Sequence, residues 1–265
     1  MIIAIDGNEA NVKNRVGIGE YAYQLLLQLV KLANLNIMFE VYLKDNPISD
    51  MPKESPYWRY KKVGPKKLWT QIGLPIALFS QKKRPDVFFT PSHYAPRFSP
   101  VPTAIAVMDL SYIHFPQLFK KRDLYQLVRW TRYSIKHASR VFTISNASKN
   151  DIIKYYKIPD ERVVVTYPGI KQEKTKSMSG TLKKFGISDK YILFVGTLQP
   201  RKNVSRLIEA FSQISPKQKD MQLVLVGKKG WLFEDILSSP QKFGVSDKVV
   251  FLDFVSNEDL PALYA

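Results

Sequence analysis

Short apolar runs and longer amphipathic stretches alternate along the first part of the chain. The runs are rich in β-branched and aromatic residues, whereas the stretches carry apolar residues at helical spacing. This alternation is typical of β-α-β units around a parallel sheet. The predicted strands are 2–6, 37–43, 87–90, 103–109 and 140–145, and the predicted helices are 19–33, 68–82, 121–137 and 146–156, the last capped by Ser145.

A second α/β part follows a change in composition after residues 167–169. Residues 171–190 are polar, charged and poor in β-branched residues, which predicts a linker or a domain boundary. We therefore predict two domains, residues 1–170 and 171–265. An open doubly wound sheet usually has about five or six strands, so we expect the second domain to be incomplete. Its predicted strands are 191–195, 222–226 and 249–254, and its predicted helices are 203–211, a short helix after Gly230 and a helix start at 257–265.

Composition excludes several kinds of site. The chain has no cysteine, so it forms no disulfide and no thiolate metal site. Its three histidines, His93, His114 and His137, lack the clustered spacing of metal ligands, and we expect no metal or other cofactor. The start of the chain does not look like a leader, and no apolar run reaches the length of about eighteen residues that a membrane span requires. We therefore expect a cytoplasmic protein.

The chain is strongly basic, with a formal net charge of +17 from 40 basic and 23 acidic residues. Residues 1–170 hold 25 basic against 13 acidic residues, and residues 171–265 hold 15 against 10. Such a field attracts nucleic acid, anionic lipid headgroups or phosphorylated substrates. The charge alone does not choose among them.

The strongest local signal lies in residues 191–211, YILFVGTLQPRKNVSRLIEAF. A buried strand is predicted to end at Gly196, where a side chain would crowd a ligand over the strand tip. A loop then brings Arg201 and Lys202 to a helix start that we expect Asn203 to cap. Free backbone N–H groups, the helix dipole and two cations suit a diphosphate. An ordinary βα loop with solvated basic residues fits the same pattern, so both interpretations stay open.

This stretch resembles the start of the carboxy-terminal domain of glycosyltransferase family four, whose members are retaining enzymes with the GT-B fold. Other segments agree with the family in order and spacing, so the resemblance covers essentially the whole chain. It implies an α/β fold of two Rossmann-like, doubly wound domains that face a cleft. The segments are GIGEYAYQLL at 17–26, PDVFFTPSHYAP at 85–96, PTAIAVMDLSYIHFPQLF at 102–119, RVFTISNASKNDI at 140–152, LVLVGKKGWLFEDI at 223–236 and VVFLDFVSNEDLPALY at 249–264.

The resemblance also implies donor-binding residues. In the family, glycines of the loop after the first strand approach the donor and acceptor; here these are Gly17 and Gly19, which could equally serve only to end a loop before a helix. The family commonly has a basic residue directly after the strand-end glycine, where this chain has Thr197. It also has a lysine five residues after that basic position, which Lys202 matches. The resemblance therefore implies a donor site at Gly17, Gly19, Gly196, Arg201 and Lys202.

Two departures from the family concern catalysis. Members often have a His-Asp pair at the end of the strand 103–109, where this chain reads Met108-Asp109. Methionine cannot move a proton, so His93 in the neighbouring loop is a candidate for the vacant role, beside Asp109; a histidine packed in a loop is an equally good interpretation. The chain also ends at Ala265, before a paired-glutamate motif that holds the donor in the family. We therefore expect slow turnover or none from this chain alone.

Residues 53–69 combine six basic residues with one acidic residue and several aromatic side chains. Cations beside interfacial aromatic residues suit the surface of an anionic bilayer, where a lipid-phosphate-linked acceptor would be delivered. A solvated loop is the alternative, and the sequence does not decide between them. The aromatic residues are Tyr57, Trp58, Tyr60 and Trp69.

The resemblance favours transfer of a sugar from a nucleotide-diphosphate donor to a polysaccharide, lipopolysaccharide or lipid-linked acceptor, at the inner face of the membrane. Met108 and the missing glutamates favour an alternative, a binding protein of the same fold that is inactive or depends on a partner. Nucleic-acid binding has only the charge and the aromatic residues in its favour, and we expect none. A nicotinamide-dependent oxidoreductase lacks its glycine fingerprint here.

Overall fold

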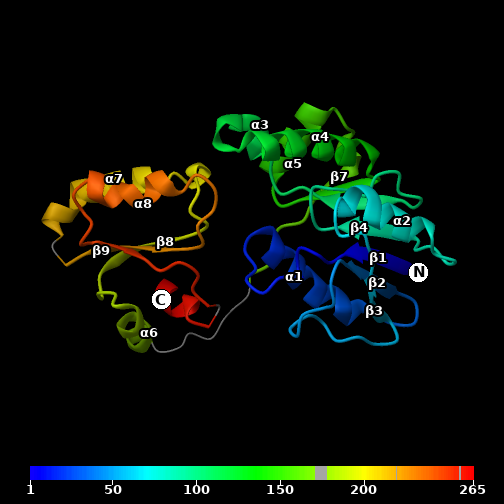
Figure 1. The fold of residues 1–265 in the computed structure, drawn as a ribbon, viewed down its shortest axis with the longest axis horizontal. Coiled ribbons are helices and arrows are strands. Elements are labelled where there is room, and N and C mark those ends of the chain that lie inside the picture. Colours follow the sequence, from blue (N-terminus) through cyan, green and yellow to red (C-terminus); the bar gives the residue numbers. More distant parts are fainter. Residues whose placement is uncertain (171–177, 219, 257) are drawn as a thin grey trace. The chain divides into compact units, whose positions relative to one another are not determined.

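A computed structural model describes residues 1–170, 178–218, 220–256 and 258–265. The chain forms two compact units (Figure 1). The first contains Met1–Pro116 and Lys121–Gly169, and the second contains Gln117–Lys120 and Ile170–Ala265. Each unit has its own parallel sheet and its own core.

The first unit is built on a seven-stranded, fully parallel sheet with the strand order β3-β2-β1-β4-β5-β6-β7. The order reverses direction at β1, because the chain adds β2 and β3 on one side of it and β4 to β7 on the other. In such sheets, ligands bind beyond the carboxyl ends of the strands where the order reverses. The strands are β1 Ile2–Asp6, β2 Met38–Leu43, β3 Trp58–Lys62, β4 Val87–Thr90, β5 Thr103–Ala106, β6 Arg140–Thr143 and β7 Val163–Val165.

Helices lie in most connections between these parallel strands, as the predicted β-α-β pattern requires, whereas β2 to β3 and β4 to β5 are joined without a helix. Ser145 caps α5 as expected, since its side chain accepts a hydrogen bond from the backbone N–H of Ser148 at 3.1 Å. The helices of the first unit are α1 Ile18–Leu29, a short 3₁₀ turn Val30–Leu32, a π-helical turn Trp69–Gly73 that continues into α2 Leu74–Phe79, α3 Ser111–His114, α4 Lys121–His137 and α5 Asn146–Tyr156; two further 3₁₀ turns are Pro116–Leu118, whose last two residues are grouped with the second unit, and Asp160–Arg162.

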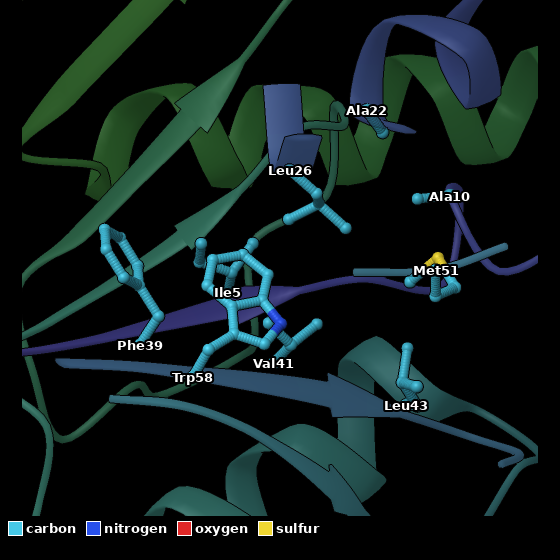
Figure 2. Close-up of a cluster of buried hydrophobic side chains, with 9 residues drawn as sticks. All are labelled: Ile5, Ala10, Ala22, Leu26, Phe39, Val41, Leu43, Met51 and Trp58. Carbon is cyan, nitrogen blue, oxygen red and sulfur yellow. The ribbon is translucent and has the colours of Figure 1, made fainter. Parts of the chain in front are cut away.

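The two faces of the sheet carry separate cores, because successive side chains of a strand point to opposite faces. On one face, Leu26 of α1 packs with Ile5, Val41 and Trp58 of the sheet (Figure 2). On the opposite face, a second cluster joins three sheet residues to the helical segment 69–79. Its members are Ala4, Tyr42, Trp69, Leu74, Ala77, Leu78 and Phe88.

The second unit has a three-stranded parallel sheet in the described residues, with the order β10-β9-β8. One face packs against α7 and α8 through Ile208 and Ile236, and the other against α6 and α9 through Leu182 and Leu263. The elements are α6 Met178–Phe185, β8 Tyr191–Val195, the 3₁₀ turn Pro200–Lys202, α7 Val204–Ile214, the 3₁₀ turn Ser215–Lys217, β9 Gln222–Val226, α8 Glu234–Lys242, β10 Val249–Phe251 and α9 Leu260–Tyr264.

At three places the elements differ from the expectations. The basic, aromatic segment 53–69, for which a solvated loop was one of two alternatives, contains an edge strand, because Trp58–Lys62 pairs with β2. The polar stretch 171–190, predicted as a linker or a domain boundary, follows directly on the division between the two units, and it also contains α6; residues 171–177 of it lie outside the described residues. Asn203 precedes α7 but does not cap it with its side chain, since its backbone is left-handed (φ 53°) and its side chain accepts no capping hydrogen bond.

Candidate functional site

The first cluster of candidate residues lies where β1, β4 and β5 end. These strands are direct neighbours in the sheet, so their loops emerge side by side at the carboxyl edge. The loop after β4 carries His93, and the loop after β5 carries Met108 and Asp109. The structure therefore brings the predicted pair His93 and Asp109 to the same edge of the first unit.

His93 is held in an apolar, aromatic environment. Its ring lies 6.4 Å from the ring of Tyr112 and 6.3 Å from that of Tyr94, and its Nδ1 is buried without a hydrogen-bond partner among the described residues. Loss of hydration lowers the pKa of the imidazole to about 4, although the nearby charge of Asp109 acts in the opposite direction. The ring is therefore neutral at pH 7, and it can exchange hydrogen bonds without carrying charge.

Asp109 has a structural contact in addition to its position beside His93. Its Oδ1 accepts a hydrogen bond from the backbone N–H of Ser111 at 2.9 Å, which fixes the turn at the start of α3. The neighbouring Met108 uses its carbonyl oxygen to accept a bond of 2.8 Å from the Ser148 hydroxyl. The loop after β5 is thus tied both to α3 and to α5, which holds the carboxylate of Asp109 in place.

Gly17 and Gly19 have distinct structural reasons for being glycine. Gly17 precedes α1 with φ 55° and ψ −116°, a conformation that L side chains rarely adopt. A Cβ at Gly19 would lie 2.9 Å from the carbonyl oxygen of Glu9, so its absence lets the loop after β1 approach α1. Both glycines lie in the first unit, at the start of the helix that follows β1.

A carboxylate at the tip of β1 was missed by the sequence interpretation. Asp6 is buried, and burial raises the pKa of its carboxyl group, opposed chiefly by hydrogen bonds from the backbone N–H and side-chain amide of Asn8 at 3.1 and 2.8 Å. Lys44, at the end of β2, adds a favourable charge. Its ammonium group lies 5.7 Å from the centre of the Trp69 ring. An acidic residue that ends a buried apolar strand was the signal in IIAID.

The second cluster of candidate residues lies in the second unit, in the loop between β8 and α7. Gly196 follows the last residue of β8, and the 3₁₀ turn Pro200–Lys202 places Arg201 and Lys202 directly before the first turn of α7. Lys202 is exposed and Arg201 is partly buried. The backbone N–H groups at the start of an eleven-residue helix add a positive partial charge there.

The loop after β9 lies against the loop between β8 and α7. The sequence interpretation did not predict this contact. Gly227 has φ 148°, and a Cβ on it would stand 2.0 Å from the carbonyl oxygen of Gly196. The N–H of Leu198 donates to the carbonyl of Lys228 at 2.9 Å, and Leu198 also forms a bridge with Lys229. The two loops together therefore carry four basic residues in the second unit: Arg201, Lys202, Lys228 and Lys229.

The aromatic residues of segment 53–69 do not form the surface that the sequence suggested. Trp58 is fully buried and Trp69 is 4% exposed, so both belong to the core. Tyr60 is partly buried and donates its hydroxyl to the carbonyl of Pro52 at 2.7 Å. Lys61 forms an ion pair with Glu40 at 2.7 Å. The expectation of interfacial tryptophans at this segment was wrong, because β3 buries Trp58 on one face of the sheet and the π-helical turn buries Trp69 on the other.

Two features of the described ranges bear on the kind of site. In those ranges, no three histidine, cysteine, aspartate or glutamate side chains gather in a way that could hold a metal ion. No helix in them is long and apolar enough to cross a bilayer.

Two family profiles match the chain. Residues 17–174 match the profile described as Glycosyltransferase Family 4, and residues 182–265 match Glycosyl transferases group 1. The O-antigen chain mannosyltransferase B of Escherichia coli is 28% identical over 165 residues, which cover 59% of this chain and 43% of that protein. The match thus spans less than half of the length of this curated relative.

Solved structures show the same fold at low sequence identity. The sucrose-phosphate synthase from Thermosynechococcus elongatus superposes with a TM-score of 0.71 at 16% identity, covering 99% of this chain and 73% of that one. An Anabaena protein solved in complex with UDP and glucose gives a TM-score of 0.68 at 18% identity, covering 99% of this chain and 71% of that one. These matches support a GT-B-like α/β architecture, in agreement with the predicted fold class.

Proposed function

Because the chain belongs to glycosyltransferase family 4, we propose that it transfers a sugar, with retention at the anomeric carbon, from a nucleotide-diphosphate donor to a polysaccharide, lipopolysaccharide or lipid-linked acceptor. One observation carries the donor half of this proposal. Four basic residues and a helix start lie on the loops after β8 and β9, and Gly227 lets these two loops pack directly against each other. This arrangement suits a diphosphate.

On the donor side, we assign the charges to the leaving group. The bond between the anomeric carbon and the diphosphate oxygen breaks, a bond to the acceptor oxygen forms, and the acceptor proton passes to the leaving phosphate. Lys202 and Arg201 offset the negative charge that grows on the diphosphate. Lys229, on the loop after β9, adds to the same field. A complex of a structural neighbour with UDP and glucose supports a nucleotide-sugar donor.

In the first unit, which we assign to the acceptor, we propose that His93 and Asp109 contact the reacting sugar. A neutral imidazole can exchange hydrogen bonds with sugar hydroxyls, which Met108 cannot do, and its low pKa keeps it neutral at working pH. The carboxylate of Asp109, which the hydrogen bond from the Ser111 N–H holds in place, supplies a hydrogen-bond acceptor near His93. The curated relative that adds mannose to O-antigen chains supports a cell-envelope glycan as the product class.

The test is release of nucleoside diphosphate. The chain would be incubated with UDP-, GDP- and ADP-sugars, and the diphosphate measured by a coupled assay, with Lys202→Ala as the variant. Lys217→Ala is the matched control, because Lys217 is an exposed lysine of the same unit far along the chain from the loop after β8. We expect Lys202→Ala to lower release more than tenfold, through loss of about 2 kcal/mol of transition-state stabilisation, and the control to leave it unchanged.

A binding protein without turnover is the second candidate, favoured by Met108 in place of a hydrogen-bonding side chain. Calorimetric titration with UDP, GDP and ADP separates the two functions. Tight nucleotide binding that Lys202→Ala weakens, together with no diphosphate release from any sugar nucleotide, would assign binding alone. An unchanged rate in Lys202→Ala would remove this lysine from the mechanism.

We also propose that the protein acts in the cytoplasm, as a peripheral protein at the inner face of a membrane. A lipid-phosphate-linked acceptor is presented at such a surface, and the net charge of +17 favours contact with anionic headgroups. With Trp58 and Trp69 in the core, this contact requires another apolar surface of the protein.

A further inference from the structure

An apolar stripe lies exposed on the helical segment that follows β3. Leu68, Ile72, Ile76 and Phe79 are 48, 39, 54 and 51% exposed. Ile72, Ile76 and Phe79 recur every three or four positions, which places them on one side of the helical segment, and Leu68 directly precedes it. We refer to these four residues as the apolar stripe. The segment ends in α2 beside β4 of the first unit (Figure 1).

The opposite side of the same helix is also apolar. Trp69, Leu74, Ala77 and Leu78 are buried there against the sheet. Residues 68–81, LWTQIGLPIALFSQ, contain no charged side chain. A surface helix of a globular protein normally turns a polar or charged face to water. A helix that is apolar on both sides, with one side exposed, indicates a surface that meets something other than water.

Basic residues flank both ends of the stripe. Lys66 and Lys67 precede it, and Lys82, Lys83 and Arg84 follow it, and all five side chains are exposed. Lys66 pairs with Asp45, whereas Asp86 is the first acidic residue after the stripe. Cations at both ends of an apolar stripe complement negatively charged headgroups that surround an acyl region.

We propose that the apolar stripe is the membrane-docking surface of this protein, and that its occupant is the interface of a bilayer rich in anionic lipid. Residues 68–79 would extend about 18 Å at ~1.5 Å per residue, too short to cross the hydrocarbon core but suited to lie in its surface. The apolar stripe enters the acyl boundary, and Lys67 and Lys82 to Arg84 contact the headgroups. This inference does not rest on the proposed sugar transfer.

Vesicle flotation tests the proposal with the full 265-residue chain. Vesicles of phosphatidylcholine alone are compared with vesicles that contain phosphatidylglycerol. The charge variant Lys82→Gln/Lys83→Gln/Arg84→Gln is expected to weaken binding to the anionic vesicles on the order of 100-fold, at roughly fivefold per basic residue. Its matched control is Lys121→Gln/Arg122→Gln/Arg129→Gln, which removes the same charge from the exposed side of α4 and is expected to change binding much less.

The apolar part of the contact is tested by Ile76→Gln/Phe79→Gln. Both side chains are about half exposed, so the change leaves the core intact, and we expect binding to fall about tenfold or more. Phe98→Gln is the control, because Phe98 is 72% exposed elsewhere in the first unit. Unfolding curves for each variant separate a loss of docking from a loss of fold.

Direct insertion is measured by a single fluorescent label, which the absence of native cysteine permits. An environment-sensitive dye on Ile76→Cys is expected to shift to the blue on anionic vesicles, whereas the same dye on Tyr125→Cys, an exposed position of α4, is expected to stay in water.

Three results would overturn the proposal: no binding to anionic vesicles, binding that survives both stripe and charge variants, or no dye shift at position 76. A dimer in solution that dissociates on Ile76→Gln/Phe79→Gln would assign the stripe to a contact between copies instead. Diphosphate release on a water-soluble acceptor should be the same in the stripe variants and the wild type, so failure of docking is distinguishable from failure of the proposed function.

Discussion

The environment of His93 predicts a histidine that stays neutral well below pH 6.5. Burial of its Nδ1, without a partner among the described residues, lowers the pKa to about 4. A histidine in the unfolded chain titrates at about 6.5. Between these two values the unfolded state binds a proton that the folded state does not. The contribution of His93 to folding stability therefore rises with pH through this window. It is fully present above about pH 6.5 and is lost as the pH falls toward 4.

The magnitude follows from the same two pKa values. At pH 5 the difference in proton binding corresponds to about 2 kcal/mol of lost stability relative to pH 7.5. His93 as a whole residue is only partly buried, so hydration of the imidazolium reduces the expected loss to ~1–2 kcal/mol. His93→Gln removes the titrating group. We therefore expect the variant to lose less stability than the wild type between pH 7.5 and pH 5, by this amount.

Two assays check the argument. Proton–carbon NMR of the histidine rings gives three resonances, for His93, His114 and His137, and His93→Gln assigns the first of them by its loss. Urea unfolding at pH 7.5 and pH 5, followed by tryptophan fluorescence, measures the change in stability. A His93 resonance that titrates near 6.5, or equal pH dependence in wild type and variant, would refute the desolvation argument and with it the neutral role of this ring in sugar transfer.

Backbone positions give further predictions, each checked by urea unfolding followed by circular dichroism. Gly227→Ala should cost about 2–5 kcal/mol and weaken nucleotide binding, because its Cβ would meet the Gly196 carbonyl; Gly244→Ala, at φ 67° with open space around it, should cost only ~1 kcal/mol, and equal losses would contradict the collision. Ser145→Ala should cost about 1 kcal/mol through loss of its cap. Asn203→Gly should change stability by less than about 0.5 kcal/mol, and a larger loss would indicate a cap that the structure lacks.

Elements with a strong apolar period were predictable from sequence. The strand Ile2–Asp6 and the helix Lys121–His137 begin and end where the pattern placed them. The edge strands Trp58–Lys62 and Val163–Val165 were not predicted, because the first alternates basic with aromatic residues and the second has only three residues. They are strands because they pair with β2 and β6, and this pairing cannot be predicted from the local sequence of either segment.

The candidate site was predictable where it depends on one segment and not where it depends on two. The loop with Arg201 and Lys202 follows from a strand, a glycine and a helix in succession. The contribution of Gly227 and Lys229 depends on β9 lying beside β8, which only the sheet order provides. The partnerless Nδ1 of His93 is likewise a result of packing around it and has no signature in the sequence.

The segment after β2 shows why aromatic and basic composition alone did not locate a membrane surface. Trp58 and Trp69 gave the signal, yet both are buried, whereas Ile76 and Phe79 gave none and are exposed. The π-helical turn that begins the docking helix lies near the sheet edge that holds the candidate residues, because Trp69 lies near the buried carboxylate of Asp6. From there the helix returns toward the start of β4, since consecutive strands of a parallel sheet require the connection to run back along it. Ile76 and Phe79 lie in the later part of this return, so a bilayer on the apolar stripe would meet the first unit along the helix and not only at the edge that holds Asp6.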